Sequence, residues 1–120
     1  MTLAELALLL ALVAHREDPL APSSVMWTAV NRARTRGTSV ELELQRPEQY
    51  KGLRVGSTPS AARRARLAAL ALRVLSDQKR DPTNGSTHFH RAGTRAPAWA
   101  PPPSEWTTLG SHHFYKERER

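Results

Sequence analysis

Apolar side chains fill almost every position of residues 3–13, with Leu and Ala on all sides of a helical projection. Thr2, followed three residues later by Glu5, is a capping-box pattern and predicts a helix over residues 3–16. A helix that is apolar all round is typical of the centre of a domain, so we expect this helix to lie there. It should end just before Pro19, because the residue preceding a proline avoids helical backbone.

Two more helices are expected further along the chain. Residues 23–36 repeat apolar side chains at helical spacing and end at Gly37, which is a common helix stop. Residues 58–78 begin with Thr58-Pro59, a favourable helix start. The side chains expected to face inward from this last helix are Ala65, Ala68, Ala69, Leu72 and Leu75. Residues 39–49 between these helices fit a helix and a strand equally well.

The C-terminal third has a different pattern, with turn signals and short alternating segments. Asn84-Gly85 favours a tight turn, since both residues tolerate positive φ. If the next residues are extended, His88 and His90 share one face and Phe89 lies on the other. A second extended segment over residues 106–115 could pair with the first to form a short β-ribbon. The chain is therefore expected to be one mainly α, α+β domain over residues 1–120, with the tail 116–120 frayed.

Composition narrows the classes of partner. The formal net charge is +7 over 120 residues, which suits a polyanion such as nucleic acid, anionic lipid or bacterial cell wall. Cysteine is absent, so thiolate metal sites and disulfides are excluded. The apolar stretch 3–13 is too short to span a bilayer and lacks the basic start of a signal peptide. We therefore expect no membrane insertion and synthesis in the cytoplasm.

Several stretches resemble one known family. The sequence Asp-Pro-Thr-Asn-Gly-Ser-Thr-His-Phe-His over residues 81–90, then Pro97-Ala98-Trp99, then Leu-Gly-Ser-His-His-Phe-Tyr over residues 109–115, is similar to the C-terminal signature of the cell-wall hydrolases typified by the spore-cortex-lytic enzyme. Ala-Val-Asn-Arg-Ala at 29–33 and the stretch 48–53 resemble the same family. The resemblance extends from about residue 4 to residue 116.

The resemblance implies a lysozyme-like fold and cleavage of the β-1,4 bond between N-acetylmuramic acid and N-acetylglucosamine in peptidoglycan. Family members act as lytic transglycosylases or lysozyme-like enzymes, and one carboxylic acid suffices for the first of these reactions. Glu17 is the expected acid, with Asp18 as the alternative. The chain reads Ala-His-Arg-Glu-Asp-Pro over 14–19 where the family has Glu-Ala-x-Gly-Glu. A shorter loop is therefore required to place Glu17 at the catalytic position.

The same resemblance implies a set of substrate-binding residues, and each also has a purely structural interpretation. The residues expected to contact the glycan are Gln49, Tyr50, Thr87, His88, His90, Trp99 and His113. Their hydroxyl and imidazole groups can hold N-acetyl and hydroxyl groups, and the indole can stack on a sugar. Alternatively, Gln49 and Tyr50 pack a loop, Trp99 anchors a Pro-rich loop, and the remaining residues belong to a β-ribbon that packs on the helices. We expect His113 to fill the histidine position of the family's Gly-x-His ending.

Three alternatives compete with this interpretation. His88 and His90 with a third ligand from His112-His113 could bind a metal, but no acidic ligand lies beside them in sequence, so no cofactor is expected. The net charge would also allow nucleic-acid binding, although the basic residues are dispersed. The third alternative is a catalytically silent glycan-binding or structural protein of the same fold. The expected partners are peptidoglycan strands and a phage or phage-like particle, with action on the wall after lysis, holin-type release or delivery by the particle.

Overall fold

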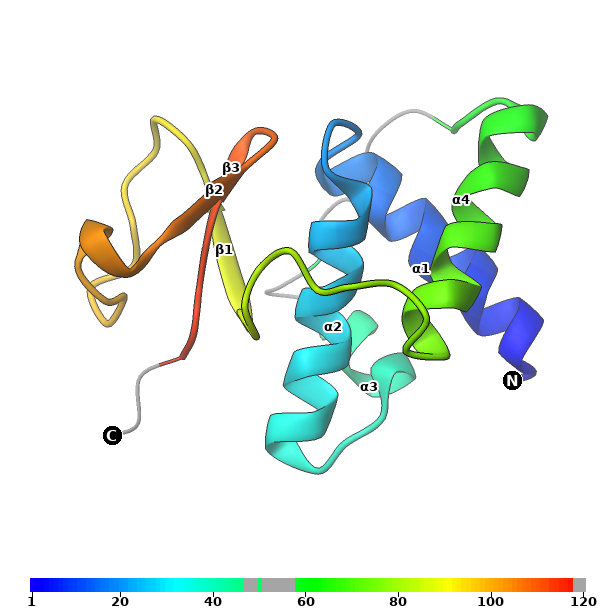
Figure 1. The fold of residues 1–120 in the computed structure, drawn as a ribbon, viewed down its shortest axis with the longest axis horizontal. Helices are drawn as coiled ribbons and strands as arrows, with labels where there is room; N and C mark the ends of the chain where they lie inside the picture. The colour runs from blue at the N-terminus through cyan, green and yellow to red at the C-terminus, as the bar shows by residue number, and fades with distance from the viewer. Residues whose placement is uncertain (47–49, 51–57, 118–120) are drawn as a thin grey trace.

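The computed structural model describes residues 1–46, 50 and 58–117, in which helices come first along the chain and a small sheet follows (Figure 1). The helices are α1 (Leu3–Glu17), α2 (Pro22–Arg36), α3 (Val40–Leu44) and α4 (Ala61–Leu75). The remaining elements are the strands β1 (His88–Arg91), β2 (Thr107–Leu109) and β3 (His112–Tyr115) and the 3₁₀ turn η2 (Pro103–Glu105). The expected mainly α, α+β class is confirmed.

The prediction for α1 is confirmed at both ends. The Thr2 side chain accepts from the Glu5 N–H, and the Glu5 carboxylate accepts from the Thr2 N–H, which completes the capping box. The helix ends at Glu17, directly before Asp18. Its central position is only partly confirmed, because Leu3 and Leu8 are about half exposed.

The most enclosed helix is α2, where every residue of the range 24–33 is buried. α2 lies between the other helices and the sheet, so it has neighbours on both sides (Figure 1). Two of its buried polar residues, Asn31 and Arg32, hydrogen-bond to the segment that precedes β1. A helix enclosed in this way needs polar partners for its polar residues, and the sheet segment supplies them.

Two predictions about the middle of the chain need correction. The ambiguous stretch forms the short helix α3, capped by the Ser39 hydroxyl. The last helix begins at Ala61 rather than at Pro59, because Ser60 is the residue that caps it, and it ends at Leu75. Its inward face was partly misplaced: the buried residues are Leu67, Ala71 and Val74. Of the expected residues, Leu75 is partly buried against the core, whereas Ala65, Ala69 and Leu72 are exposed. Ala and Leu occur on several sides of this helix, so its apolar stripe was ambiguous.

The expected β-ribbon is a three-stranded antiparallel sheet in the order β1-β3-β2. The segment 106–115, expected to be one strand, turns back on itself at Gly110, whose φ of +56° suits glycine. Asn84 and Gly85 both have positive φ, as the turn prediction requires. The sheet contributes Phe114 to the core, against which Phe89 and Leu109 pack. In the described part of the chain no helix has the length and apolar character needed to cross a membrane.

Candidate active site

Glu17 is the last residue of α1 and is half-buried. Burial raises the pKa of the Tyr50 hydroxyl above its ordinary value, and the negative charge of Glu17 adds to the increase. Glu17 also takes part in an interaction within the protein, so it is not isolated. The expected acid is thus at a helix end, partly screened from water, and close to the residues that join the helices to the sheet.

Asp18, the alternative acid, has a different environment. It is fully buried, and its Oδ2 accepts from the Ser111 N–H at 2.8 Å and from His112 Nδ1 at 2.8 Å. Its Oδ1 accepts from the Leu20 N–H at 3.1 Å. A carboxylate with both oxygens engaged in buried hydrogen bonds holds structure together, so Asp18 attaches the end of α1 to the β2–β3 turn.

Gly110 makes this attachment possible. A Cβ at Gly110 would lie 2.6 Å from the Asp18 Oδ2 and 2.7 Å from the Ala21 Cβ, both well inside van der Waals contact. Only a glycine lets the turn approach the carboxylate this closely, and the positive φ adds a second requirement for glycine. The β2–β3 turn is therefore fitted to the residue that follows Glu17.

The expectation for His113 is wrong by one residue. Counted from Gly110, the histidine of Gly-x-His is His112, and the following Phe114 and Tyr115 then also fit the family's ending. His112 is the buried partner of Asp18, whereas the His113 Nδ1 lies 2.7 Å from the Thr108 hydroxyl on the neighbouring strand. In this protein the histidine at this position has a structural role, because it bonds to Asp18, the residue next to the candidate acid.

The two faces of the sheet carry different side chains. In the register of the sheet Phe89 is paired with Phe114, and both rings lie against the helical core. The opposite face carries the partners His88 and Tyr115, and the partners His90 and His113. The alternation expected along β1 is confirmed. It also means that the histidines expected to bind substrate lie on the face of the sheet that is turned away from the helices.

A layer of aromatic rings covers this outer face. The Trp99 ring stands edge-on to His88 with 4.8 Å between centroids, and the Trp106 ring stands edge-on to His90 at the same separation. The His90 and His113 rings are 5.2 Å apart. The structure thus brings together four of the expected substrate-binding residues: His88, His90, Trp99 and His113. Trp106 belongs to the same layer and was not predicted as part of the site.

Both histidines of β1 are held neutral. Burial lowers the pKa of His88 to about 3, and the positive charges of Arg32 and Arg36 contribute to the decrease. Burial and the neighbouring His113 and His112 also lower the pKa of His90. A neutral imidazole has one donor and one acceptor nitrogen, so these rings offer hydrogen bonds without charge.

Thr87 and Tyr50 lie inside the protein. The Thr87 hydroxyl bonds to His88 Nδ1 at 2.9 Å and accepts from the Glu117 N–H at 2.8 Å. The Tyr50 hydroxyl bonds to the Thr28 hydroxyl at 3.0 Å, and the Arg32 guanidinium lies over its ring. Both side chains therefore support neighbouring residues. Gln49, the remaining expected contact, lies outside the described residues.

Asn31 and Asp81 form a link that the sequence interpretation missed. Asn31 Nδ2 donates to the Asp81 carboxylate at 2.9 Å and to the Ser86 carbonyl at 3.0 Å. Asp81 also accepts from the Thr83 and Gly85 N–H groups, so it organises the whole turn before β1. The Asp-Pro and Asn-Gly turn signals indicated this turn, but no local signal points to a partner 50 residues away.

No metal centre is formed by the described ranges 1–46, 50 and 58–117, in which no three His, Asp or Glu side chains lie close enough to share an ion. The described site thus consists of a carboxylate at the end of α1, a buried attachment beside it, and a histidine-rich sheet. Glycoside cleavage depends on a positioned carboxylic acid, so these parts are compatible with the class of glycan-cleaving enzymes.

The comparison with protein families agrees with this class. The family model for cell wall hydrolases matches residues 17–115, which is most of the chain. The protein belongs to the cell wall hydrolase family and is an enzyme that acts on the bacterial cell wall. The match begins at Glu17 and includes the whole sheet. No curated protein and no solved structure shows a significant match to the chain.

Proposed function

We propose that this protein cleaves the β-1,4 bond between N-acetylmuramic acid and N-acetylglucosamine, with Glu17 as acid and base. The observation that carries the proposal is the position of Glu17 at the end of α1, where its neighbour Asp18 is bonded to the β2–β3 turn. This attachment holds the end of α1, and with it Glu17, in place beside the β2–β3 turn. Membership of the cell wall hydrolase family supports peptidoglycan as the substrate.

A single carboxylic acid can complete the transglycosylase reaction. Glu17 donates its proton to the glycosidic oxygen as the bond from the anomeric carbon to that oxygen breaks. The C6 hydroxyl of the same muramic acid attacks the anomeric carbon, and its proton passes to the Glu17 carboxylate. The products are a free 4-hydroxyl and a 1,6-anhydromuramyl end, and Glu17 is again protonated. In a muramidase, water would take the place of the C6 hydroxyl.

The outer face of the sheet suits sugar rings beyond the cleaved bond. His90 and His113 are partly exposed rings that can bond to hydroxyl and N-acetyl groups, and Trp99 and Trp106 are partly exposed indoles. In this proposal Thr87 and Tyr50 act indirectly, since both side chains are buried. The lysozyme-like fold, the likeness to spore-cortex-lytic enzymes and a role as a phage endolysin or part of a phage-like particle belong to the same proposal.

The test is digestion of purified peptidoglycan by the wild type and by Glu17→Gln, with the products identified by mass spectrometry. Glu5→Gln is the matched control, because it removes a carboxylate from the other end of α1 and glutamine keeps the capping box. We expect the wild type and Glu5→Gln to release anhydro-muropeptides and Glu17→Gln to release none while unfolding at the same urea concentration.

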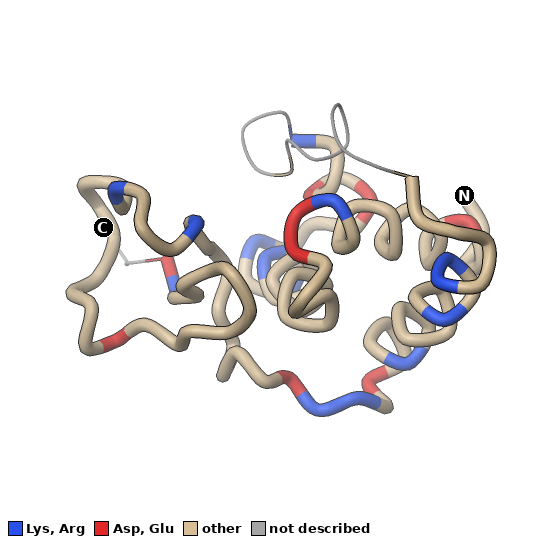
Figure 2. The backbone as a smooth tube through the Cα atoms, turned by 90° about the horizontal axis from the view of Figure 1, so that it is seen from above, with Lys and Arg blue, Asp and Glu red and all other residues tan. Residues whose placement is uncertain are grey.

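The products decide between the finer alternatives. Reducing ends in place of anhydro ends would make the protein a hydrolase with the same acid. Equal activity of Glu17→Gln and wild type would remove Glu17 from the mechanism. No soluble fragments from any of the three proteins would favour the catalytically silent, glycan-binding alternative. Salt-sensitive binding to generic DNA would instead favour nucleic acid, although Figure 2 shows Lys and Arg spread over several elements.

A further inference from the structure

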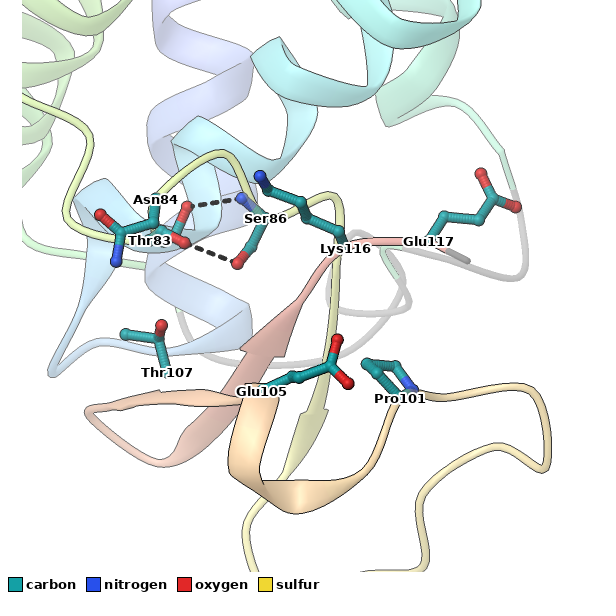
Figure 3. Close-up of a pocket in the computed structure, with 8 residues that line it drawn as sticks. All are labelled: Thr83, Asn84, Ser86, Pro101, Glu105, Thr107, Lys116 and Glu117. Atoms are coloured by element: carbon teal, nitrogen blue, oxygen red, sulfur yellow. Dashed lines mark hydrogen bonds between the residues drawn. The ribbon is translucent and has the colours of Figure 1, made fainter. Parts of the chain in front are cut away.

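A cavity of about 390 Å³ opens at the end of the sheet that is far from the β2–β3 turn (Figure 3). Three segments surround it: the turn before β1, the stretch from Pro101 to the start of β2, and the residues that follow β3. The lining residues are Thr83, Asn84, Ser86, Pro101, Glu105, Thr107, Lys116 and Glu117. None of them is assigned to the proposed cleavage of the glycan.

One wall of the cavity is fixed by hydrogen bonds. The Ser86 N–H donates to the Thr83 hydroxyl at 3.2 Å, and the Ser86 hydroxyl donates to the Thr83 carbonyl at 2.7 Å, as the dashed lines in Figure 3 show. Both residues are buried. A ligand in the cavity would therefore meet a preformed surface on this side, which lowers the entropic cost of binding.

Two side chains of opposite charge also line the cavity, and they do not form an ion pair with each other. Lys116, which lies across Gly85, and Glu105, which comes from η2, are drawn on opposite sides of the cavity. Neither forms an ion pair with any residue of the described part of the chain, and both are exposed. Glu117 is different, because its carboxylate lies 3.5 Å from Arg36.

We propose that this cavity binds the zwitterionic end of a peptidoglycan stem peptide, with its ammonium group near Glu105 and its carboxylate near Lys116. N-acetylated glycan strands carry no ammonium group, whereas stem peptides have a free carboxyl end and a diamino acid whose side chain can carry a free amino group. A pair of separated opposite charges therefore matches the peptide part of the polymer. This inference rests on the proposed function for its choice of polymer.

The distance from the candidate acid is compatible with a peptide attached to the cleaved strand. His112, at the start of β3, is bonded beside Glu17, and Lys116 follows the end of β3. Four strand residues extend about 13 Å. An extended stem peptide of four or five residues spans about 13–18 Å. A glycan strand held at Glu17 could thus place the end of its peptide in the cavity.

The experiment is an NMR titration of the whole protein with a soluble tetrapeptide that ends in a zwitterionic diamino acid, and it needs no catalysis. We expect shifts of the backbone amides of Ser86, Thr107 and Lys116 at millimolar peptide. Glu105→Gln and Lys116→Met should each weaken binding about two- to fivefold, the range of an exposed ion pair. Lys79→Met, which lies outside this cavity, should leave binding unchanged.

Blocked peptides identify the charge that each residue recognises. Acetylation of the ammonium group should weaken wild-type binding and abolish the effect of Glu105→Gln, while the effect of Lys116→Met remains. Absence of shifts, or shifts that Glu105→Gln and Lys116→Met do not reduce, would overturn the inference even if peptidoglycan is cleaved. If the protein binds the peptide but releases no fragments from peptidoglycan, the result would support the proposed peptide site and contradict only the proposed cleavage.

Discussion

The Asp18 carboxylate and the His112 imidazole are bonded at 2.8 Å although 94 residues separate them in the sequence. Both side chains are almost completely buried. The same carboxylate accepts from the Ser111 N–H, so one side chain holds two consecutive residues of the sheet. This contact joins the helical part of the protein to the sheet at the residue next to Glu17.

Asp18→Ala is expected to destabilise the protein by about 1–3 kcal/mol for each buried donor that it leaves without an acceptor. The substitution leaves three donors without an acceptor, those of Leu20, Ser111 and His112. Asp18→Asn keeps one acceptor oxygen and should cost clearly less. Urea unfolding of the three proteins measures both differences. A loss below 1 kcal/mol for Asp18→Ala would contradict the structural role.

Gly110→Ala is expected to be more harmful than Gly37→Ala. Both glycines have a φ near +60°, so both variants carry the cost of a left-handed alanine, about 1–2 kcal/mol. Only the Cβ at position 110 would collide, with Asp18 and Ala21, whereas nothing lies within 4 Å of the Cβ position at Gly37. The difference between the two unfolding free energies therefore isolates the close approach. Equal losses would show that the turn can move away from Asp18 at no cost.

Stability should decrease as the pH falls below about 6.5, before carboxylates begin to titrate. The pKa of His88 is about 3 in the folded protein and 6.5 in the reference state, so between these values the unfolded chain binds more protons. The stabilisation is complete above pH 6.5 and is lost progressively towards pH 3. From pH 7 to pH 5 the expected loss is about 2 kcal/mol.

His88→Phe is the control for this pH dependence, because it keeps an aromatic ring against Trp99 and cannot titrate. Its unfolding free energy, measured by urea titration at pH 5, 6 and 7, should change less than that of the wild type. His90, whose pKa is lowered too, accounts for a remaining slope of the same sign. A variant with the wild-type slope would show that His88 is not the group that titrates.

Asn31→Ala is expected to loosen the segment before β1. The change removes two donated hydrogen bonds, to Asp81 and to the Ser86 carbonyl, at a cost of about 1–3 kcal/mol. Amide hydrogen exchange should increase for residues 83–88 and remain unchanged in α4. Thr35→Ala, one helical turn further along α2 and exposed, is the control. Unchanged protection in the Asn31 variant would mean that Asp81 alone maintains the turn.

The sequence was most informative where one local pattern decides the structure. The capping box at Thr2, the Asn84-Gly85 turn and the alternation along β1 each depend on neighbouring residues, and each was predicted. Predictions were wrong where two local patterns compete, as in α4, where Ala and Leu allow several inward faces.

The attachments between distant residues were not predictable from local patterns. Asp18 bonds to His112, 94 positions further along the chain, and Asn31 bonds to Asp81, 50 positions further along. No neighbouring sequence pattern indicates the partner of any of these residues. The family resemblance supplied the site residues, but it could not show which face of the sheet is turned towards the helices. That orientation follows from the packing of Phe114 and Phe89 on the helical core, a property of the folded protein.

The order of the elements along the chain also bears on the order of folding. α1, α2 and α4 contact one another, and a helical core can therefore form while the C-terminal residues are still being made on the ribosome. The sheet depends on contacts of long sequence separation, which form slowly because a large loop must close first. β3 is the central strand of the sheet and follows β1 and β2 along the chain. Assembly of the proposed site is consequently expected late in folding, because the β2–β3 turn must close on Asp18 after the helices have formed.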